Sequence, residues 1–244
     1  MSSHLTYENI QKEAEAFAAI YRKSHKVPKL PGEKELLKYN KLLCMKYSHL
    51  IELVKNHVSH QNTWLAHDFD HLVYISVLSS YVSEKECEFR KITGLNNVND
   101  IIHKAMLSGL LHDIERQRGF GEDHMIEGEQ TAIRLLEKVG ISVKIITETV
   151  RHHDHADFKP TQNILQIVYG SVFDADHFRY GLEREDTFWK MKEKIGVSPE
   201  DVIHDYKFLP PLRNAWKTHY GKEVGPKLID FGLAVAKHIE KKFS

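Results

Sequence analysis

The residues with the clearest chemical potential in this sequence are histidines that stand beside aspartates. The best case is the run from Leu107 to Asp113, in which apolar residues at helical spacing lead into His112 and Asp113. The small residues Ser108 and Gly109 would let a neighbouring helix come close. Adjacent residues on a helix point about 100° apart, yet both can reach one ion held between converging helices. An imidazole nitrogen and a carboxylate oxygen delivered to one point are typical of a divalent metal site.

Other histidines and aspartates stand at the ends of further predicted helices. The chain has 17 histidines, and histidine is both the commonest protein metal ligand and the natural acid or base near neutral pH. In chain order these positions are His71, His112-Asp113, His124, His152-His153 and either Asp174 or Asp176. A sphere of imidazoles and carboxylates suits Mn, Fe, Co, Ni or Zn rather than Ca. We expect a transition-metal site and leave open which of the two last aspartates belongs to it.

The elements that must position these residues are predicted to be helices. Apolar residues recur at helical spacing over about 5–25, 33–58, 99–113, 123–139, 142–152, 161–178 and 222–241. A further helix is expected after Asp68 and Asp70, either of which could provide its N-terminal cap. Segments 27–32, 84–100 and 115–122 are predicted as connectors or loops. We expect an all-α, single-domain helical bundle. Residues 65–182 would form its metal-binding core, with helices of 1–64 packing on it and 183–244 completing the same domain.

Composition excludes several classes of protein. The chain has 244 residues, with 34 Lys and Arg against 34 Asp and Glu, so no global basic charge would attract long nucleic acid or an anionic membrane. No apolar run approaches the roughly 18 residues of a membrane span, and the polar start of the chain does not resemble a signal peptide. The two cysteines lack a metal or redox spacing. We expect a cytoplasmic protein, and the apolar stripe over 33–58 is either core or the seam of a homodimer.

The ordered set of residues resembles the HD-domain superfamily of metal-dependent phosphohydrolases, whose signature is His, His-Asp and Asp on converging helices. The motifs that carry the resemblance, over roughly 65–182, are Asp-Phe-Asp-His71, Leu-Leu-His112-Asp113, His124-x-x-x-Gly128 and Ala-Asp176-x-Phe. The resemblance implies an HD-like helical core and a metal held by His71, His112, Asp113 and Asp176. It also favours Asp176 over Asp174. In dinuclear members, positions matching His124 and His152 bind a second metal bridged by the residue at Asp113, and His153 could take part. In mononuclear members the same positions contact the phosphate or position a water.

The function implied by this resemblance is hydrolysis of a small phosphorylated molecule, such as a nucleotide, by a monoesterase or a diesterase. A divalent cation polarises a phosphoryl oxygen and makes hydroxide available near neutral pH. The candidate catalytic residues are Asp113, Glu115, His124 and His152, with Glu115 as a proton acceptor. The candidate substrate ligands are Arg116, Arg151, Arg179 and His153, because a guanidinium suits bidentate contact with phosphate. The alternatives are an HD-type di-iron oxygenase and a non-catalytic, ligand-sensing HD module.

Overall fold

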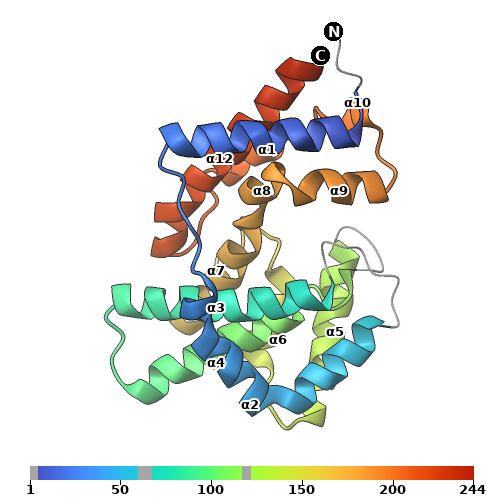
Figure 1. Cartoon of the computed structure of the whole chain (residues 1–244). Helices are drawn as coiled ribbons and strands as arrows, with labels where there is room; N and C mark the ends of the chain where they lie inside the picture. Colours follow the sequence, from blue (N-terminus) through green and yellow to red (C-terminus); the bar gives the residue numbers. More distant parts are fainter. Residues whose placement is uncertain (1–4, 60–67, 117–121) are drawn as a thin grey trace. The chain divides into compact units, whose positions relative to one another are not determined.

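Helices account for all the regular structure in the part of the chain that the structure describes, so the all-α prediction is confirmed. The computed structural model describes residues 5–59, 68–116 and 122–244, apart from the side chain of residue 122. The helices, shown in Figure 1, are α1 (Tyr7–Ser24), α2 (Glu33–Ser59), α3 (Phe69–Phe89), α4 (Leu95–Leu111), α5 (Glu122–Lys138), α6 (Lys144–His152), α7 (Asn163–His177), α8 (Arg179–Leu182), the 3-10 helix η2 (Glu183–Glu185), α9 (Thr187–Lys194), α10 (Pro199–Val202), α11 (Leu209–Leu212) and α12 (His219–Phe243).

The helices pack into two compact units. One contains the chain up to Lys29, His177–Trp216 and Lys222–Ser244, and its core is formed by the buried apolar faces of α1, α9 and α12. The other contains Leu30–Asp176 and Lys217–Gly221. Every candidate site residue except Arg179 lies in this second unit. The part boundaries expected near residues 64 and 182 stay predictions, and the first of them falls outside the described residues.

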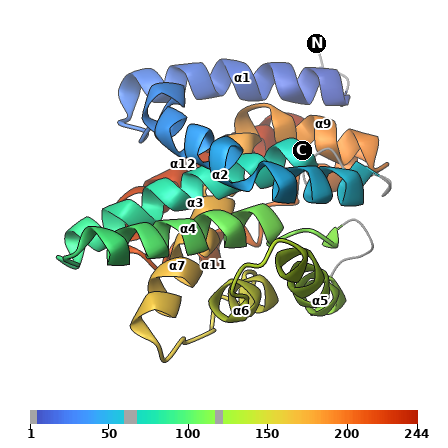
Figure 2. The same cartoon turned by 90° about the horizontal axis from the view of Figure 1, so that it is seen from below.

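At the centre of the second unit, α3 and α4 run side by side, as the views in Figures 1 and 2 both show. A Cβ atom added at Gly109 would lie only 2.6 Å from Ser79 Oγ and 2.8 Å from the Ile75 carbonyl oxygen. The hydroxyl of Ser76 donates a 2.7 Å hydrogen bond to the carbonyl of Met106 on the opposite helix. The predicted close approach at small residues is therefore confirmed, and it fixes the end of α4 that precedes the His-Asp pair.

The prediction of a loop over residues 84–100 is wrong for most of that range. Helix α3 continues to Phe89 and α4 already begins at Leu95. Several of the polar residues that suggest a loop lie on helices and are paired there: Glu84 Oε2 accepts from Lys38 Nζ at 2.6 Å, and Glu88 Oε2 accepts from Lys85 Nζ at 2.8 Å. The turn itself is short and uses Gly94, whose φ of 92° is readily adopted by glycine. The other predicted helices are present, with ends that differ by a few residues.

Helix α2 packs its apolar stripe inward, so residues such as Leu43, Leu50 and Val54 belong to the core of this unit. The helix is not continuous. At Tyr47 the backbone has φ −125° and ψ 24°, outside the helical region, which joins two helical segments across a kink. The kink occurs without proline or glycine, which are its usual causes.

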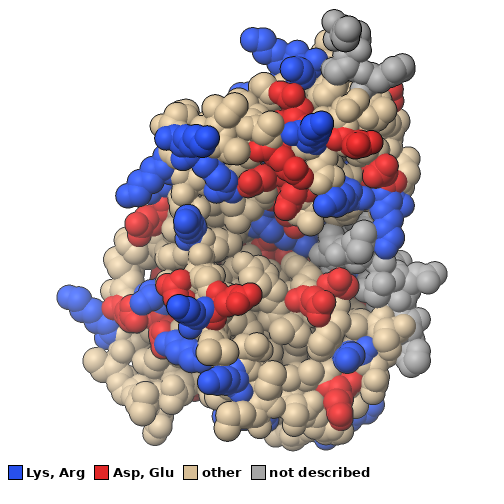
Figure 3. Space-filling model, in the orientation of Figure 1, with Lys and Arg blue, Asp and Glu red and all other residues tan. Residues whose placement is uncertain are grey.

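The surface carries charges of both signs. On the face shown in Figure 3, lysines and arginines are interspersed with acidic side chains. This mixture agrees with the equal numbers of basic and acidic residues in the sequence. Among the described residues, none of the helices combines the length and the apolar character that crossing a bilayer requires.

Candidate metal centre

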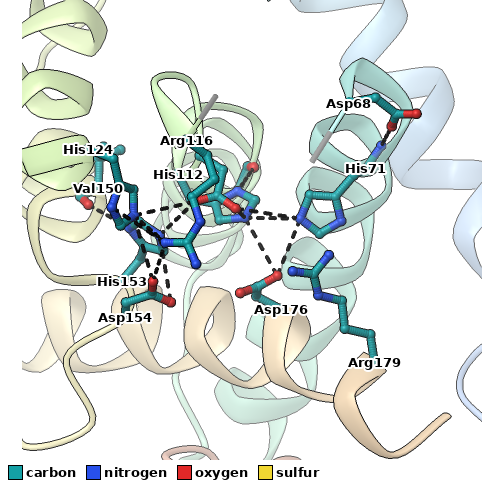
Figure 4. Close-up of polar contacts among 12 residues, drawn as sticks. Asp68, His71, His112, Arg116, His124, Val150, His153, Asp154, Asp176 and Arg179 are labelled. Carbon is teal, nitrogen blue, oxygen red and sulfur yellow. Dashed lines mark hydrogen bonds and ion pairs between the residues drawn. The ribbon is translucent and has the colours of Figure 1, made fainter. Parts of the chain in front are cut away.

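Three helices bring the first group of ligand atoms together (Figure 4). His71 lies in the first turn of α3, where the side chain of Asp68 caps the helix by accepting from the His71 backbone N–H at 2.9 Å. His112 follows the end of α4, and Asp176 lies in the last turn of α7. His71 Nε2 is 3.3 Å from both His112 Nε2 and Asp176 Oδ1. One ligand atom from each residue lies within 4.8 Å of the others, so this group could hold a metal ion.

A second group lies beside the first and contains Asp113, His124 and His153. His124 comes from the first turn of α5, and His153 follows the end of α6. Their Nε2 atoms lie 3.7 Å and 3.1 Å, respectively, from Asp113 Oδ1. All three side chains are buried. This group could also hold a metal ion.

The carboxylate of Asp113 lies between the two groups. Its Oδ2 atom is 3.4 Å from His112 Nε2 and 4.0 Å from His71 Nε2, whereas its Oδ1 atom faces His124 and His153. A carboxylate with one oxygen directed to each set of nitrogens has the arrangement required to bridge two cations.

Two of the histidines are held in a defined tautomer. The Nδ1 atom of His112 lies 2.8 Å from the carbonyl oxygen of Gly109, and the Nδ1 atom of His153 lies 2.8 Å from that of Val150. Because a carbonyl can only accept, each Nδ1 must carry the hydrogen. In the neutral ring the lone pair is then on Nε2, the atom directed at Asp113. Hydrogen bonds of this kind to the second ring nitrogen typically orient histidine ligands of metals.

The electrostatics favour a positive charge in the first group. Burial alone would lower the pKa of His112, but the carboxylates of Asp113 and Asp176 outweigh it and raise that pKa to about 10. The pKa of His153 is also raised, because Asp154 and Asp113 overcome the effect of burial. In contrast, burial and the positive charges of His153 and Arg116 lower the pKa of His124 to about 4. His124 is therefore neutral at pH 7, which is the state that binds a metal.

The second group contains His153 and not His152, the residue predicted as the partner of His124 at a second metal. The ring of His152 stacks on Phe158, with centroids 4.0 Å apart, and its Nδ1 lies 3.3 Å from His155 Nδ1. The cause is the helical phase, because consecutive residues at the end of α6 point about 100° apart and only one can face Asp113. A catalytic role for His152 stays a prediction.

The structure distinguishes the two aspartates at the end of α7. The carboxylate of Asp174 is fully buried and accepts hydrogen bonds from the backbone N–H groups of Lys217 and Thr218, at 2.9 and 2.8 Å, and from the Thr218 hydroxyl at 2.6 Å. Burial raises its pKa to about 7, although these hydrogen bonds oppose the shift. Asp174 therefore anchors the segment before α12, and Asp176 is the aspartate that joins the metal group.

Glu115, the candidate proton acceptor, is buried behind the site. Its Oε1 atom accepts from the Thr131 hydroxyl at 2.6 Å and lies 2.8 Å from His57 Nε2 of α2. These partners fix the carboxylate between α2 and α5, which favours a structural contribution. Its catalytic role stays a prediction.

The predicted phosphate-binding arginines lie in different surroundings. The Nη1 atom of Arg116 is 2.8 Å from His124 Nε2 and 2.9 Å from Asp154 Oδ2, so this guanidinium lies at the second group. Arg151 pairs with Glu129 at 3.2 Å. Arg179 begins α8 in the other unit, where its Nε lies 3.9 Å from Glu183 Oε1. Contact of any of the three with a substrate stays a prediction.

Sequence reasoning gave no role to Asp154, which the structure brings to the second group. Its Oδ2 lies 3.7 Å from His124 Nε2, and its Oδ1 lies 3.9 Å from His153 Nε2. About a quarter of its side chain is exposed, 24%, in contrast to the buried Asp113. The signal was present in the run Arg-His-His-Asp-His at the end of the predicted helix, in which the carboxylate follows the two histidines directly.

No family model, curated protein or solved structure matches this chain. Membership of the HD-domain superfamily therefore stays a prediction from the motifs. The geometry of the site carries the functional argument alone.

Proposed function

We propose that this protein is a metal-dependent phosphohydrolase that acts on a small phosphorylated molecule, a nucleotide being one candidate. The observation that supports the proposal best is the position of Asp113, whose two carboxylate oxygens face two separate sets of ligand nitrogens. Such a centre supplies, when loaded, a Lewis acid for phosphoryl oxygens and an activated water near neutral pH.

The chain's residues fit divalent transition metals. His71, His112, Asp113 and Asp176 would hold the first ion, and Asp113, His124 and His153 would hold the second. Buried carboxylates are costly in free energy unless a cation compensates them. The mixture of imidazole and carboxylate ligands suits Mn, Fe, Co, Ni or Zn.

Two further residues are suited to the chemistry around the ions. Arg116 carries a permanent positive charge beside His124, where its guanidinium could contact two oxygens of a phosphate. Asp154 is partly exposed at the same group and could take a proton from the attacking water. With a pKa of about 4, His124 is a poor proton acceptor at neutral pH, so its role in the proposal is that of a ligand.

The test uses the full-length chain, stripped with a chelator and reloaded separately with Mn²⁺, Co²⁺, Ni²⁺, Fe²⁺ or Zn²⁺. Phosphate release is measured on a panel of nucleotides and phosphate esters, together with the metal content per chain. We expect activity with at least one ion, and its loss in Asp113→Asn. His155→Ala is the matched control, because His155 lies near the site but in neither group. Stoichiometric metal binding without phosphate release from any ester would overturn the hydrolase proposal.

The same experiment addresses an oxygenase, because a bridging carboxylate between histidines also fits two irons. That alternative predicts two irons per chain and consumption of oxygen by the iron-loaded protein. A Mn-loaded or Co-loaded protein that releases phosphate without oxygen would exclude it.

A further inference from the structure

A pocket of about 490 Å³ lies in the second unit among residues to which the metal centre gives no role. Its walls come from the kink of α2, one side of α4 between Asn96 and Leu107, and the segment that leads into the first turn of α6. The exposed lining residues Asn96, Asn99 and Ser142 are polar, whereas the buried lining residues Leu107 and Ile146 are apolar. This volume is in the range of pockets that bind small molecules.

The kink at Tyr47 shapes one wall of this pocket. The Tyr47 hydroxyl lies 2.5 Å from His103 Nδ1 on α4, and the two rings meet edge to face. Lys46, the residue before the kink, directs its ammonium group to within 3.5 Å of His103 Nε2. The residue at which the helix departs from helical geometry is thus the same one that contacts His103 in the pocket wall.

The charge of the pocket is positive. Lys104 is paired with Asp100 on the same helix, so these two charges compensate each other. Burial and the neighbouring Lys46 lower the pKa of His103, which keeps that ring neutral at pH 7. In the part of the chain that the structure describes, Lys46 has no carboxylate partner. One positive charge therefore remains at the pocket.

The beginning of α6 adds hydrogen-bond donors. The helix starts at Lys144, and its N-cap Val143 provides no side-chain hydrogen bond to the first backbone N–H groups. Ser142, in the pocket wall, is the residue directly before that cap. The N-terminus of a helix carries a partial positive charge and donors that suit an anion.

We propose that this pocket is a second ligand site, and that it binds a small phosphate monoester with an apolar body. The phosphate would lie between Lys46 and the start of α6, with the asparagine amides and the Ser142 hydroxyl as further donors. Three phosphate oxygens can accept more hydrogen bonds than the two of a carboxylate. The apolar side chains of Leu107 and Ile146 would contact the rest of the ligand. This site would exist whether or not the metal centre is hydrolytic.

The test is isothermal titration of the metal-free, full-length chain with phenyl phosphate and, in a parallel arm, with benzoate. We expect saturable binding of phenyl phosphate that is about tenfold or more weaker in Lys46→Glu, because a repulsive charge replaces an attractive one. Lys41→Glu is the matched control, since Lys41 is exposed on α2 outside the pocket. Ser142→Asp, which places a carboxylate before α6, should weaken binding as well.

Three results would each overturn the proposal of a phosphate site in this pocket. Absence of binding, or binding that is equal in Lys46→Glu and Lys41→Glu, would exclude this pocket as the site. Equal affinity for benzoate and phenyl phosphate would refute the phosphate assignment. Because no metal is present, coordination of the phosphate by a metal ion does not contribute, and binding through Arg116 at the metal centre would be equal in Lys46→Glu and Lys41→Glu.

Discussion

Substitution of the neighbouring histidines 152 and 153 gives the sharpest test of the metal centre. The two residues have the same side chain and adjacent positions, but only His153 faces Asp113, at 3.1 Å. We expect His153→Ala to weaken binding of the second cation strongly and His152→Ala to leave it nearly unchanged. The contrast isolates geometry, since the same side chain is removed from adjacent positions in both variants.

The expected magnitude follows from the number of ligands. A structural zinc ion held by four ligands contributes about 10–16 kcal/mol, or about 3 kcal/mol for each ligand. Loss of His153 should therefore weaken the second cation by roughly a hundredfold. Loss of the stacking between His152 and Phe158 removes about 1 kcal/mol of stability and no metal ligand.

The assay is titration of the chelator-treated protein with Co²⁺, followed by its visible absorption and by metal content after gel filtration. Wild type and His152→Ala should bind two ions per chain, and His153→Ala should retain one at the same free concentration. Because His153 is buried, His153→Gln is a second variant that leaves a smaller cavity. Loss of the second ion in His152→Ala, or its retention in both His153 variants, would refute the assignment.

Four further outcomes are expected. Gly109→Ala should lower the free energy of unfolding in urea by about 1–3 kcal/mol, because its Cβ would meet the backbone of α3, whereas Gly32→Ala, with nothing within 4 Å, should not. Thr218→Val should lower the free energy of unfolding by about 1–3 kcal/mol, because it removes one hydrogen-bond donor from the buried carboxylate of Asp174. Thr161→Val, at an exposed position, should lower it little. Equal values for the two variants would contradict the anchoring role of Asp174. The raised pKa of His112 means that Co²⁺ must displace a proton, so its affinity should rise by about tenfold for each pH unit up to about pH 10. In the metal-free protein the same raised pKa contributes stability that is complete below pH 6.5 and is lost as the pH rises through about 10, measured as the pH dependence of unfolding.

Much of the fold could be predicted from the sequence because its helices are strongly periodic. The run that ends in His112-Asp113 has apolar residues at helical spacing and small residues at the α3 contact, and both features are present in the structure. The polar residues of segment 84–100 predict a loop, although most of the segment is helical. Polarity of a surface helix face and polarity of a loop look alike until the partners, such as Lys38 for Glu84, are known.

Only part of the candidate site could be predicted from the sequence, because side-chain directions and partners depend on how the helices fold. The order of predicted helix ends indicates His71 and His112, but it leaves Asp174 and Asp176 open, and only the resemblance to the HD-domain superfamily favours Asp176. The choice between His152 and His153 depends on the helical phase at the end of α6, and a shift of one residue changes the direction by about 100°. The partners of Glu115, His57 and Thr131, come from helices that are distant in sequence.

The structure suggests why two of the histidines follow the ends of helices. The last carbonyl groups of a helix have no partner within it. His112 and His153 each donate from Nδ1 to the carbonyl three residues earlier, which satisfies one such acceptor and leaves Nε2 to face Asp113. The same Nδ1 hydrogen bond thus lies at the end of the helix, fixes the tautomer of the histidine and orients its Nε2 toward Asp113. An insertion of one residue before His153 would keep every side chain but turn its ring away from Asp113, so the position of the helix end is as important to this centre as the identity of its ligands.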